Sequence, residues 1–417
     1  MNSDSAFSAD WAFFADWRSR PEGSRRSLDR ARWLLRLIGL SGADVPVLTV
    51  VGSKGKGTAA TYASAFLAAS GGRVVTVTSP GLRSNRERIR LDGAAISTAD
   101  LESLGDQISR GLSLLPGRDQ LPGHLAPAGL FTTAGVLYAQ AVEADYLVLE
   151  AGMGGGSDEV SLFPPSVVAI AEIFAEHVGV LGDSPEEIAR EKASVVAGQT
   201  EAVLSLPQQP SVREAIESVV RDRAGLELDV LDAVGGSLPM RVLPPSYGRW
   251  NAELGCAAAR RMLELLDRDL PQPGALERVL ESVRLPGRMS RHVVPGGETE
   301  VWIDSPISQA GIATALKMTR ERWKTIDHVL LCLPDHKDVA GAIIELAGYP
   351  VTFVRLADAH FTFTKSLPDE WPVIDESELT PQFLSGLGKR VLSLGTVFFS
   401  GRMLDVLNAQ TERLFVA

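Results

Sequence analysis

The sequence predicts an α/β protein with a doubly wound, mainly parallel sheet domain followed by a smaller α/β domain. Short apolar runs rich in β-branched residues alternate with segments of helical periodicity, and parallel strands need such helical crossovers. A glycine-rich turn joins the first of these runs to the next helix. A turn-rich stretch near 285–288 is followed by a second α/β series, so we expect domains at 1–285 and 286–417.

Composition excludes several classes of protein. The chain has 417 residues, 45% of them hydrophobic and 22% charged, which is the balance of a soluble globular protein. Its net charge of −11 argues against a general nucleic-acid binder, and no apolar run is long enough to span a bilayer. Two cysteines cannot build a disulfide framework, and the first thirty residues lack the layout of a secretion signal. We therefore expect a cytoplasmic protein.

Periodicity and capping residues predict the elements of the first domain. Apolar positions at helical spacing predict a helix over 27–39, and aromatic residues within 1–26 indicate a short helix docked on the body. We expect strands at 45–51, 74–78, 146–150 and 167–173, and helices at 58–70, 131–142 and 185–197. The last helix has the clearest signals: Ser184 as N-cap, Pro185 at the first position, Glu187 completing a capping box and Gly198 beyond its end.

The second domain has the same alternation. Its expected strands lie near 300–303, 328–333, 351–354 and 390–394, with helical segments between them. The series is long enough for an independent small domain.

The segment Gly52-Ser-Lys-Gly-Lys-Gly-Thr58 carries the strongest chemical signal. Between a strand and a helix, its backbone N–H groups and the helix N-terminus can bind a phosphate. Lys56 would neutralise phosphate charge and Thr58 would reach a Mg²⁺ ion, although Gly57 separates them, unlike the general P-loop pattern. The alternative is a tight turn whose lysines face solvent. The candidate nucleotide-binding residues of this loop are Ser53, Lys54, Gly55, Lys56, Gly57 and Thr58.

Three further residues are candidates of different strength. Glu150 closes an apolar strand before a run of glycines, at the edge where open α/β sheets bind ligands, and its carboxylate suits Mg²⁺. The alternative for Glu150 is a solvated acid at a strand end. Taken alone, His177 indicates a structural histidine and Lys192 an exposed helical lysine.

A set of motifs runs in order along the chain. After Leu28-Asp-Arg30 and the glycine-rich loop come Thr78-Ser-Pro-Gly-Leu82, Asn85-Arg-Glu-Arg-Ile89, Glu150-Ala-Gly-Met-Gly-Gly155 with Asp158, Glu176-His177, Arg190-Glu-Lys-Ala193, Pro286-Gly-Arg288, His336-Lys-Asp338 and Gly395 to Gly401. With these motifs the chain resembles the folylpolyglutamate synthase and dihydrofolate synthase family of the Mur ligase superfamily. The resemblance implies a P-loop domain followed by a Rossmann-like domain.

The resemblance also implies an activity. Members of this family join a carboxylic acid to an amino acid through an acyl phosphate made with ATP. The implied catalytic residues are Lys56, Glu150, His177 and Lys192, and the implied metal ligands are Thr58, Ser79, Glu150 and His177, with two Mg²⁺ ions. It further implies carbamylation of Lys192, and nucleotide contacts from Asn251, Arg288 and Asp304. The expected partners are small-molecule acid and amino acid substrates, with no nucleic acid and no membrane.

Several positions depart from the family pattern. Gly81 replaces a histidine, Gly156 an arginine, and Tyr247-Gly248 a His-Gln pair, while Asp304-Ser-Pro-Ile-Ser308 replaces Asp-Gly-Ala-His-Asn. These changes leave two alternatives open besides a folate substrate: an amide ligase for a non-folate acid in specialised metabolism, and a degenerate nucleotide-binding protein without catalysis. Gly57 and the Arg-Glu-Lys-Ala segment count against a kinase or motor-type NTPase.

Overall fold

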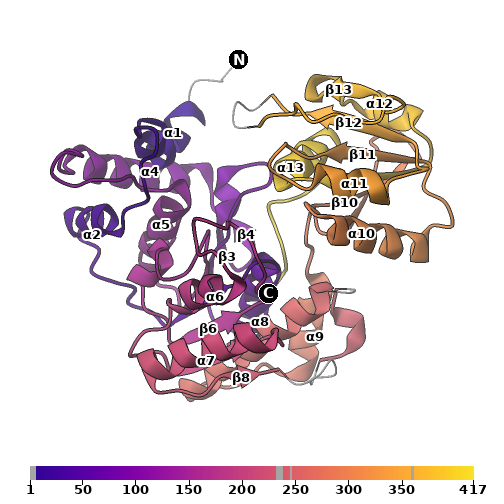
Figure 1. Cartoon of the computed structure of the whole chain (residues 1–417). Coiled ribbons are helices and arrows are strands. Elements are labelled where there is room, and N and C mark those ends of the chain that lie inside the picture. Colours follow the sequence, from indigo (N-terminus) through magenta and orange to yellow (C-terminus); the bar gives the residue numbers. More distant parts are fainter. Residues whose placement is uncertain (1–5, 232–237, 245–246, 358–360) are drawn as a thin grey trace. The chain divides into compact units, whose positions relative to one another are not determined.

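The computed structural model describes residues 6–231, 238–244, 247–357 and 361–417 (Figure 1). The chain forms two compact units. Unit 1 comprises residues up to Gly81, Asn85–Val283 and Arg413–Ala417, whereas unit 2 comprises Leu82–Ser84 and Arg284–Glu412. Each unit therefore includes a short segment, Leu82–Ser84 in unit 2 and Arg413–Ala417 in unit 1, that is separated in sequence from the rest of that unit.

Unit 1 has a large sheet with helices packed on it. Its elements are α1 (Ala6–Arg18), α2 (Leu28–Leu37), β1 (Val47–Val51), α3 (Lys56–Ala69), β2 (Val74–Val77), η1 (Asn85–Arg88), β3 (Ile89–Leu91), β4 (Ala94–Ala95), α4 (Thr98–Ser113), α5 (Pro127–Ala141), β5 (Tyr146–Glu150), η2 (Glu159–Leu162), β6 (Val167–Ile170), α6 (Pro185–Ala193), β7 (Ala202–Ser205), α7 (Pro210–Ala224), β8 (Asp229–Val230), η3 (Met240–Val242), α8 (Tyr247–Leu265) and α9 (Pro273–Ser282).

The strand order of this sheet is β4-β3-β2-β5-β1-β6-β7-β8, eight strands within the described residues. Neighbouring strands in the series β2-β5-β1-β6-β7-β8 pair in parallel. Strands β3 and β4 add an antiparallel edge beside β2. The central strands are fully buried, which suits their apolar sequences. Val50 pairs with Glu150, and Val51 pairs with Ile170, so β1, β5 and β6 end at one edge of the sheet. The predicted doubly wound parallel sheet is confirmed.

Some predicted boundaries were wrong. Helix α3 begins at Lys56 rather than 58, because Gly55 takes a left-handed conformation (φ 89°) that starts the helix inside the glycine-rich loop. Helix α5 begins at Pro127 rather than 131, since proline is favoured in a first helical turn. Strand β6 ends at Ile170 rather than 173.

Helix α6 also differs from its prediction. It ends at Ala193, so Gly198 does not terminate it. Ser184 caps the helix by accepting from the N–H of Glu187, as expected. The Glu187 carboxylate, however, accepts from the N–H of Asp183 at 2.7 Å, so the predicted capping box is only half formed. The shorter helix leaves Lys192 in its last turn.

Unit 2 has a smaller sheet with helices on both faces. Its elements are β9 (Ser290–Val293), β10 (Glu300–Asp304), α10 (Gln309–Arg322), β11 (His328–Cys332), α11 (Val339–Glu345), β12 (Val351–Arg355), β13 (Val373–Asp375), η4 (Glu376–Glu378), α12 (Pro381–Gly386), β14 (Arg390–Gly395) and α13 (Val397–Val406). Within the described residues the strand order is β13-β12-β11-β14-β10-β9, in which β9 alone is antiparallel to its neighbour.

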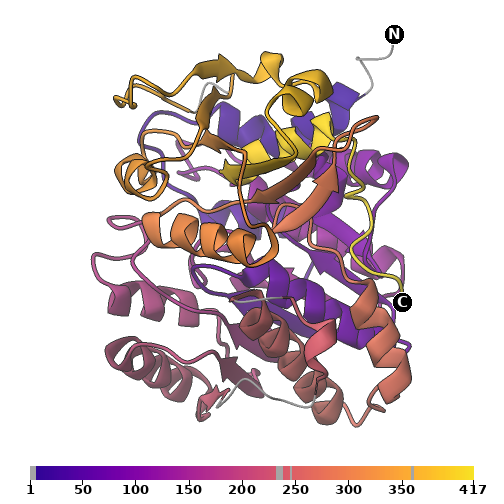
Figure 2. The same ribbon diagram turned by 90° about the vertical axis from the view of Figure 1, so that its right-hand side faces the viewer.

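Alternate side chains of β11 enter two separate cores of unit 2. Val329 and Leu331 pack with α10 and α11 on one face, whereas Leu330 and Cys332 pack with α12 and α13 on the other. Figures 1 and 2 show α10 and α11 on one side of this sheet. The apolar run from Val329 to Cys332 in β11 suits this burial on both faces.

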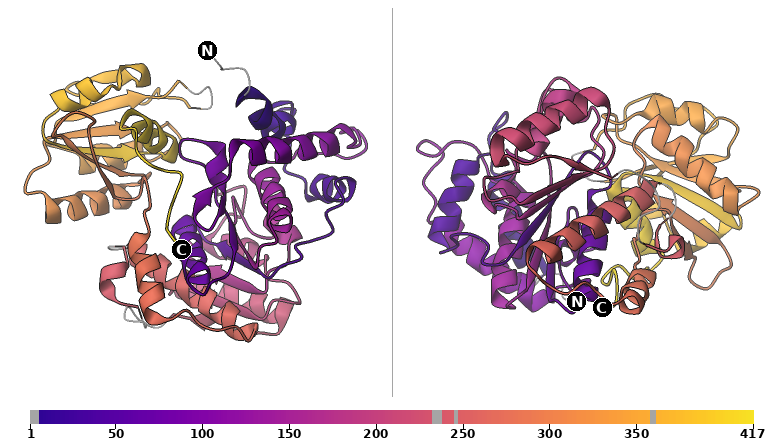
Figure 3. Two further views of the ribbon diagram at one scale, coloured as in Figure 1. Left: turned by 180° about the vertical axis from the view of Figure 1, so that it is seen from behind. Right: turned by 90° about the horizontal axis from the view of Figure 1, so that it is seen from below.

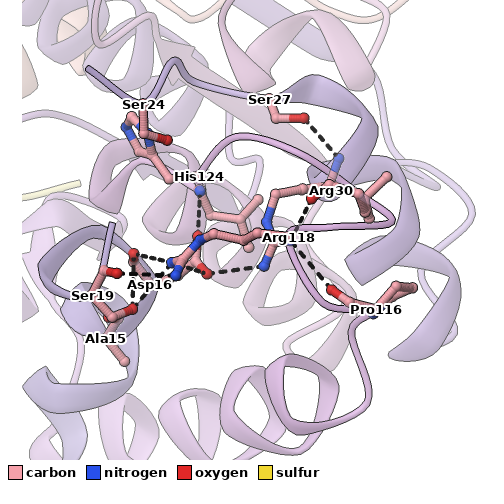
Figure 4. Close-up of polar contacts among 11 residues, drawn as sticks. Ala15, Asp16, Ser19, Ser24, Ser27, Arg30, Pro116, Arg118 and His124 are labelled. Atoms are coloured by element: carbon pink, nitrogen blue, oxygen red, sulfur yellow. Dashed lines mark hydrogen bonds and ion pairs between the residues drawn. The ribbon is translucent and has the colours of Figure 1, made fainter. Parts of the chain in front are cut away.

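A buried carboxylate fixes α1 to unit 1 (Figure 4). Asp16 lies 3.0 Å from Nη2 of both Arg30 and Arg118, and it accepts from the N–H of Leu125 at 2.6 Å. Arg30 in turn donates to the carbonyl of Leu121 at 2.8 Å. Apolar contact adds to this anchor, because α1 also stacks Phe13 on a ring of α5. The predicted docking of this helix is confirmed.

The last residues of the chain pack on unit 1 (Figure 3). The N–H of Leu414 donates to the carbonyl of Gly93 at 2.9 Å, and the N–H of Val416 donates to Oγ of Ser282, the last residue of α9, at 2.8 Å. None of the helices in the described residues is both long and apolar enough to cross a membrane.

Replacing Asp16 with Ala should destabilise the protein by about 3 kcal/mol, because Arg30 would remain buried without its carboxylate partner. Asp29→Ala is the matched control: the Asp29 side chain is 75% exposed and pairs with Arg32 on one helix face, so its loss should cost less than about 0.5 kcal/mol. Urea unfolding followed by circular dichroism compares the two variants. Equal losses in both would contradict the anchoring role of Asp16.

Candidate functional site

The glycine-rich loop lies between β1 and α3, as its sequence predicts. Gly55 is the N-cap of α3, and within the described residues it receives no side-chain cap. The first-turn amides of a helix have no intrahelical partner, so they are suited to bind an anion. Ser53 is held differently: its N–H donates to the carbonyl of Glu172 at 2.8 Å, and its hydroxyl donates to the carbonyl of Phe174. Hydrogen bonds therefore hold the loop at Ser53, and its other end is the N-terminus of α3.

Two lysines meet at this loop. Nζ of Lys56 and Nζ of Lys192 each donate to the carbonyl oxygen of Gly52, both at 3.0 Å. Lys192 also lies 2.8 Å from Oε1 of Glu176. Lys54, by contrast, is exposed. The structure thus places two of the predicted cations at one end of the loop.

The environment of Lys192 differs from that of an exposed helical lysine. The residue is 1% exposed, and burial lowers the pKa of its amine, with the nearby charge of Lys56 adding to the effect. The carboxylate of Glu176 opposes part of this shift in pKa. The alternative that Lys192 is a solvated surface residue is therefore wrong.

Glu150 lies beside the same loop. A Cβ built on Gly57 would lie 3.4 Å from Oε2 of Glu150, so the carboxylate reaches the first turn of α3. The same Oε2 accepts from the N–H of Ser79 at 3.0 Å. The Ser79 hydroxyl accepts from Nη1 of Arg88 at 3.1 Å. Glu150 is 8% exposed, which excludes the alternative of a solvated acid at a strand end.

Two more predicted residues of unit 1 adjoin the loop. Asn251, on α8, packs against the loop so closely that a Cβ on Gly55 would lie 2.1 Å from its Oδ1. Thr58 lies in the first turn of α3 and is 9% exposed. The predicted nucleotide-binding residues of unit 1 therefore gather around a single helix N-terminus.

His177 is linked to the loop through its neighbour. Its Nε2 lies 4.0 Å from Oε2 of Glu176, whose other oxygen binds Lys192. The His177 side chain is 47% exposed, and its backbone is left-handed with φ 48°. Glu176 therefore lies between His177 and Lys192. The sequence motif Glu176-His177 did not predict the contact with Lys192.

Arg288 and Asp304 lie together in unit 2. Oδ1 of Asp304 accepts from the N–H of Met289 at 3.2 Å, which ties the Pro-Gly-Arg turn to the end of β10. Arg288 itself is exposed. Whether these residues contact nucleotide stays a prediction.

The metal ligands predicted in unit 1 are mainly oxygen donors. In the part of the chain that the structure describes, no three His, Cys, Asp or Glu side chains form a metal-binding group. A set with the Thr58 and Ser79 hydroxyls and one Glu150 carboxylate is chemically suited to Mg²⁺, which keeps several waters and binds substrate phosphates. It does not resemble the closed set of a structural zinc site.

Two carboxylates that sequence reasoning did not select as site residues hold the loop after β5: Glu191, on α6, and Asp158, within the loop. Oε1 of Glu191 accepts from the N–H groups of Gly155 and Ser157 at 3.3 and 2.8 Å. At the far end of the loop, Asp158 accepts from the N–H of Met153 and from Nη1 of Arg26, both at 3.0 Å. Neither carboxylate reaches across the sheet edge to the glycine-rich loop in any contact of the described residues, and both hold backbone instead.

Comparison with known proteins adds to this geometry. No protein-family model matches the chain. The dihydrofolate synthase/folylpolyglutamate synthase of Mycobacterium tuberculosis is 30% identical over 361 residues, which cover 77% of this chain and 72% of that protein. A probable bifunctional folylpolyglutamate synthase/dihydropteroate synthase of Haloferax volcanii is 30% identical over 346 residues, 76% of this chain and 40% of the relative. The structure of Mycobacterium tuberculosis folylpolyglutamate synthase complexed with ADP and AMPPCP has a TM-score of 0.77 at 22% identity, covering 93% of this chain and 96% of that one.

The doubly wound sheet with its glycine-rich loop, the second α/β unit and the structural match define a two-domain protein of the Mur ligase-like fold. The chain belongs to the dihydrofolate synthase/folylpolyglutamate synthase family. It spans less than half the length of some curated relatives, 40% in the Haloferax volcanii protein.

Replacing Gly155 with Ala tests how closely the loop after β5 must pack on α6. A Cβ at Gly155 would lie 2.1 Å from the carbonyl oxygen of Lys192, so the loop and the helix must move apart. We expect a loss of about 1–3 kcal/mol in unfolding free energy, measured by urea denaturation. Gly198→Ala is the control, because a Cβ there meets nothing within 4 Å. An unchanged stability in Gly155→Ala would contradict this contact.

Proposed function

We propose that the protein is an ATP-dependent ligase that joins a carboxylic acid to an amino acid through an amide bond. The observation that carries this proposal is the convergence of Lys56 and Lys192 on the carbonyl of Gly52, at the N-terminus of α3. The Lys56 ammonium and the free amides at a helix N-terminus suit a polyphosphate chain. The relative solved with ADP and AMPPCP supports ATP as the nucleotide.

The loop residues would bind the nucleotide phosphates. The amides of Gly55, Lys56 and Gly57 lie in the first turn of α3, where hydrogen-bond donors and the helix dipole favour negative charge. Lys56 would move from the Gly52 carbonyl to a phosphate oxygen when nucleotide binds. Asn251, which packs on Gly55, would lie against the nucleotide, and Arg288 and Asp304 of unit 2 would complete its binding.

Magnesium is the metal that the donors of unit 1 fit. Thr58 and Glu150 would hold one ion, with Ser79 as a further oxygen ligand, and His177 would hold a second. Bound Mg²⁺ supplies charge neutralisation for the phosphates. The N–H of Ser79 keeps the Glu150 carboxylate oriented toward the first turn of α3 through its 3.0 Å hydrogen bond.

The reaction would proceed in two steps that balance. A carboxylate oxygen of the acid attacks the γ-phosphorus of ATP, the bond to ADP breaks, and an acyl phosphate forms. The amine nitrogen of the amino acid then attacks the carbonyl carbon, loses a proton and expels phosphate. The chain contributes orientation and positive charge, supplied by Lys56 and the loop amides, rather than a covalent nucleophile.

The acid substrate has two candidates. Folate-type acids with glutamate are the most economical pair, because the related proteins are named for that chemistry. Two positions favour a different acid: Gly81 and Gly156 lack the side chains of the family pattern, and a Cβ on Gly156 would already lie 2.6 Å from Cβ of Ser194. A non-folate carboxylic acid is therefore the second candidate substrate.

Lys56→Ala should reduce product formation by at least about 100-fold, because the phosphates lose a positioned charge. Product mass spectrometry with Mg-ATP, glutamate and either dihydropteroate or a reduced folate measures the addition of glutamate. Lys317→Ala, an exposed lysine of α10, is the control and should keep wild-type activity.

Two results would change the proposal in different ways. If no product forms with folate-type acids but hydroxylamine captures an acyl phosphate from another acid, the ligase chemistry stands with a different substrate. If the wild type binds ATP and activates no carboxylate, the protein binds nucleotide without catalysis.

We also propose that Lys192 is carbamylated in the working enzyme. Only a neutral amine reacts with CO₂, and burial of Lys192 lowers the pKa of its amine, which favours that form. The product is an anion, so it would exchange the cation beside Glu176 for a group that can support the second metal ion.

Incubation with ¹³C-bicarbonate should give a carbamate signal in the ¹³C NMR spectrum of the wild type. Lys192→Arg keeps a positive charge that cannot be carbamylated, so it should lose this signal and about 100-fold or more of the activity. A spectrum identical in both proteins would contradict the modification.

A further inference from the structure

Glu191 holds the loop that follows Glu150 to the helix that carries Lys192. Its Oε1 accepts from the N–H of Gly155 at 3.3 Å, from the N–H of Ser157 at 2.8 Å and from the hydroxyl of Ser157 at 2.5 Å. Three donors on one carboxylate oxygen form a charge-assisted set, which is stronger than the same number of neutral hydrogen bonds.

Backbone contacts strengthen the same junction. The N–H of Gly156 donates to the carbonyl of Glu191 at 3.0 Å. Gly155 lies so close to the next residue of the helix that a Cβ there would approach the Lys192 carbonyl oxygen to 2.1 Å. The loop and the last turn of α6 are therefore in direct backbone contact, and the Glu191 side chain fixes their alignment.

The other end of the loop is fixed independently. Asp158 accepts from the N–H of Met153, and Arg26 donates both to Asp158 and to the carbonyl of Met153, at 3.0 and 3.3 Å. This end packs on the N-terminal segment rather than on α6. Of the two ends of the loop, the one held by Glu191 is therefore the end that contacts α6.

The order of residues in α6 gives this junction a functional meaning. Successive side chains leave an α-helix about 100° apart. Glu191 points to the loop after β5, whereas Lys192 points to the loop after β1, where Nζ binds the Gly52 carbonyl and Glu176. A rotation or slide of α6 would therefore displace the Lys192 amine from the glycine-rich loop.

We infer that Glu191 is a positioning residue: it locks α6 against the loop after Glu150 and so holds Lys192 at the glycine-rich loop. The inference rests on the proposed ligase function for its effect on catalysis, but the positional link itself is independent of any activity. Glu191 touches neither Lys56 nor the helix N-terminus in any contact of the described residues, so it should act on Lys192 and leave nucleotide binding intact.

The test compares Glu191→Ala with Glu214→Ala, an exposed glutamate of the neighbouring helix α7. Brief treatment with acetic anhydride in buffer freed of CO₂, so that the amine carries no carbamate, followed by peptide mass spectrometry, measures how accessible the Lys192 amine is. Because Lys192 is 1% exposed, wild type and Glu214→Ala should be acetylated little at this site. Glu191→Ala should show an increase of about tenfold, as the amine leaves its buried place.

Kinetics provide the second measurement. Glu191→Ala should lower kcat by about 10- to 100-fold, since a small displacement of a charged group suffices, and leave KM for ATP within about twofold. Glu191→Gln keeps an acceptor oxygen, so it should recover low acetylation and most of kcat. A general loss of folding would instead lower activity and nucleotide binding together, which thermal melting and ATP titration detect.

Two results would overturn the inference. Equal acetylation of Lys192 in Glu191→Ala and Glu214→Ala would show that Glu191 does not hold the helix. Greater acetylation with unchanged kcat in an active enzyme would show that this position of Lys192 has no catalytic use. If the wild type makes no product with any acid, the proposed function fails, while the acetylation result still decides the positional link.

Discussion

Lys56 and Lys192 share one carbonyl oxygen, that of Gly52. The predicted site residues of unit 1 lie around this contact. Like charges repel at such a place unless anions balance them. Glu176 supplies one negative charge on the Lys192 side, and the helix N-terminus of α3 adds further positive potential. An arrangement with this surplus of positive charge favours a polyphosphate ligand. It also accounts for the lowered pKa of Lys192, since burial and the charge of Lys56 both disfavour its protonated form.

The parallel sheet of unit 1 makes this convergence possible. Strands β1, β5 and β6 end in register, so the segments that follow them begin at the same edge, although β1 ends at Val51 and the other two end at Glu150 and Ile170. The loop after β1 carries the lysine and glycines, β5 ends in Glu150, and the segment after β6 carries Glu176 and His177. Two glycines then allow close packing. Gly57 lies beside the Glu150 carboxylate, and Gly155 lies against the backbone of α6 at Lys192. A side chain at Gly155 would force the loop after β5 away from the backbone of α6.

The family relationship and the departures from its pattern concern different parts of the site. The glycine-rich loop, Glu150 and Lys192 match the family pattern at the positions predicted to bind phosphate and metal. Gly81 and Gly156 stand where that pattern has larger residues. At Gly156 the structure gives a physical reason, since Ser194 occupies the space that a side chain would need. In unit 2, Asp304 still binds the backbone next to Arg288, although the residues after it have changed.

The sequence by itself determined the doubly wound sheet, the glycine-rich loop and the four central strands of each sheet, because apolar periodicity and glycine placement are local signals. It did not predict the strands at the edges of the sheets. It singled out Lys56, which follows β1, and Glu150, which ends β5, as candidates for the same local reason. It misplaced the starts of α3 and α5, which Gly55 and Pro127 set locally, and the end of α6. It could not show that Lys192 is buried or that Glu176 lies between Lys192 and His177. Nor could it show that Glu191 accepts hydrogen bonds from the loop after β5. Only the tertiary structure decided these, because burial and charge pairing depend on contacts between segments that are remote in sequence.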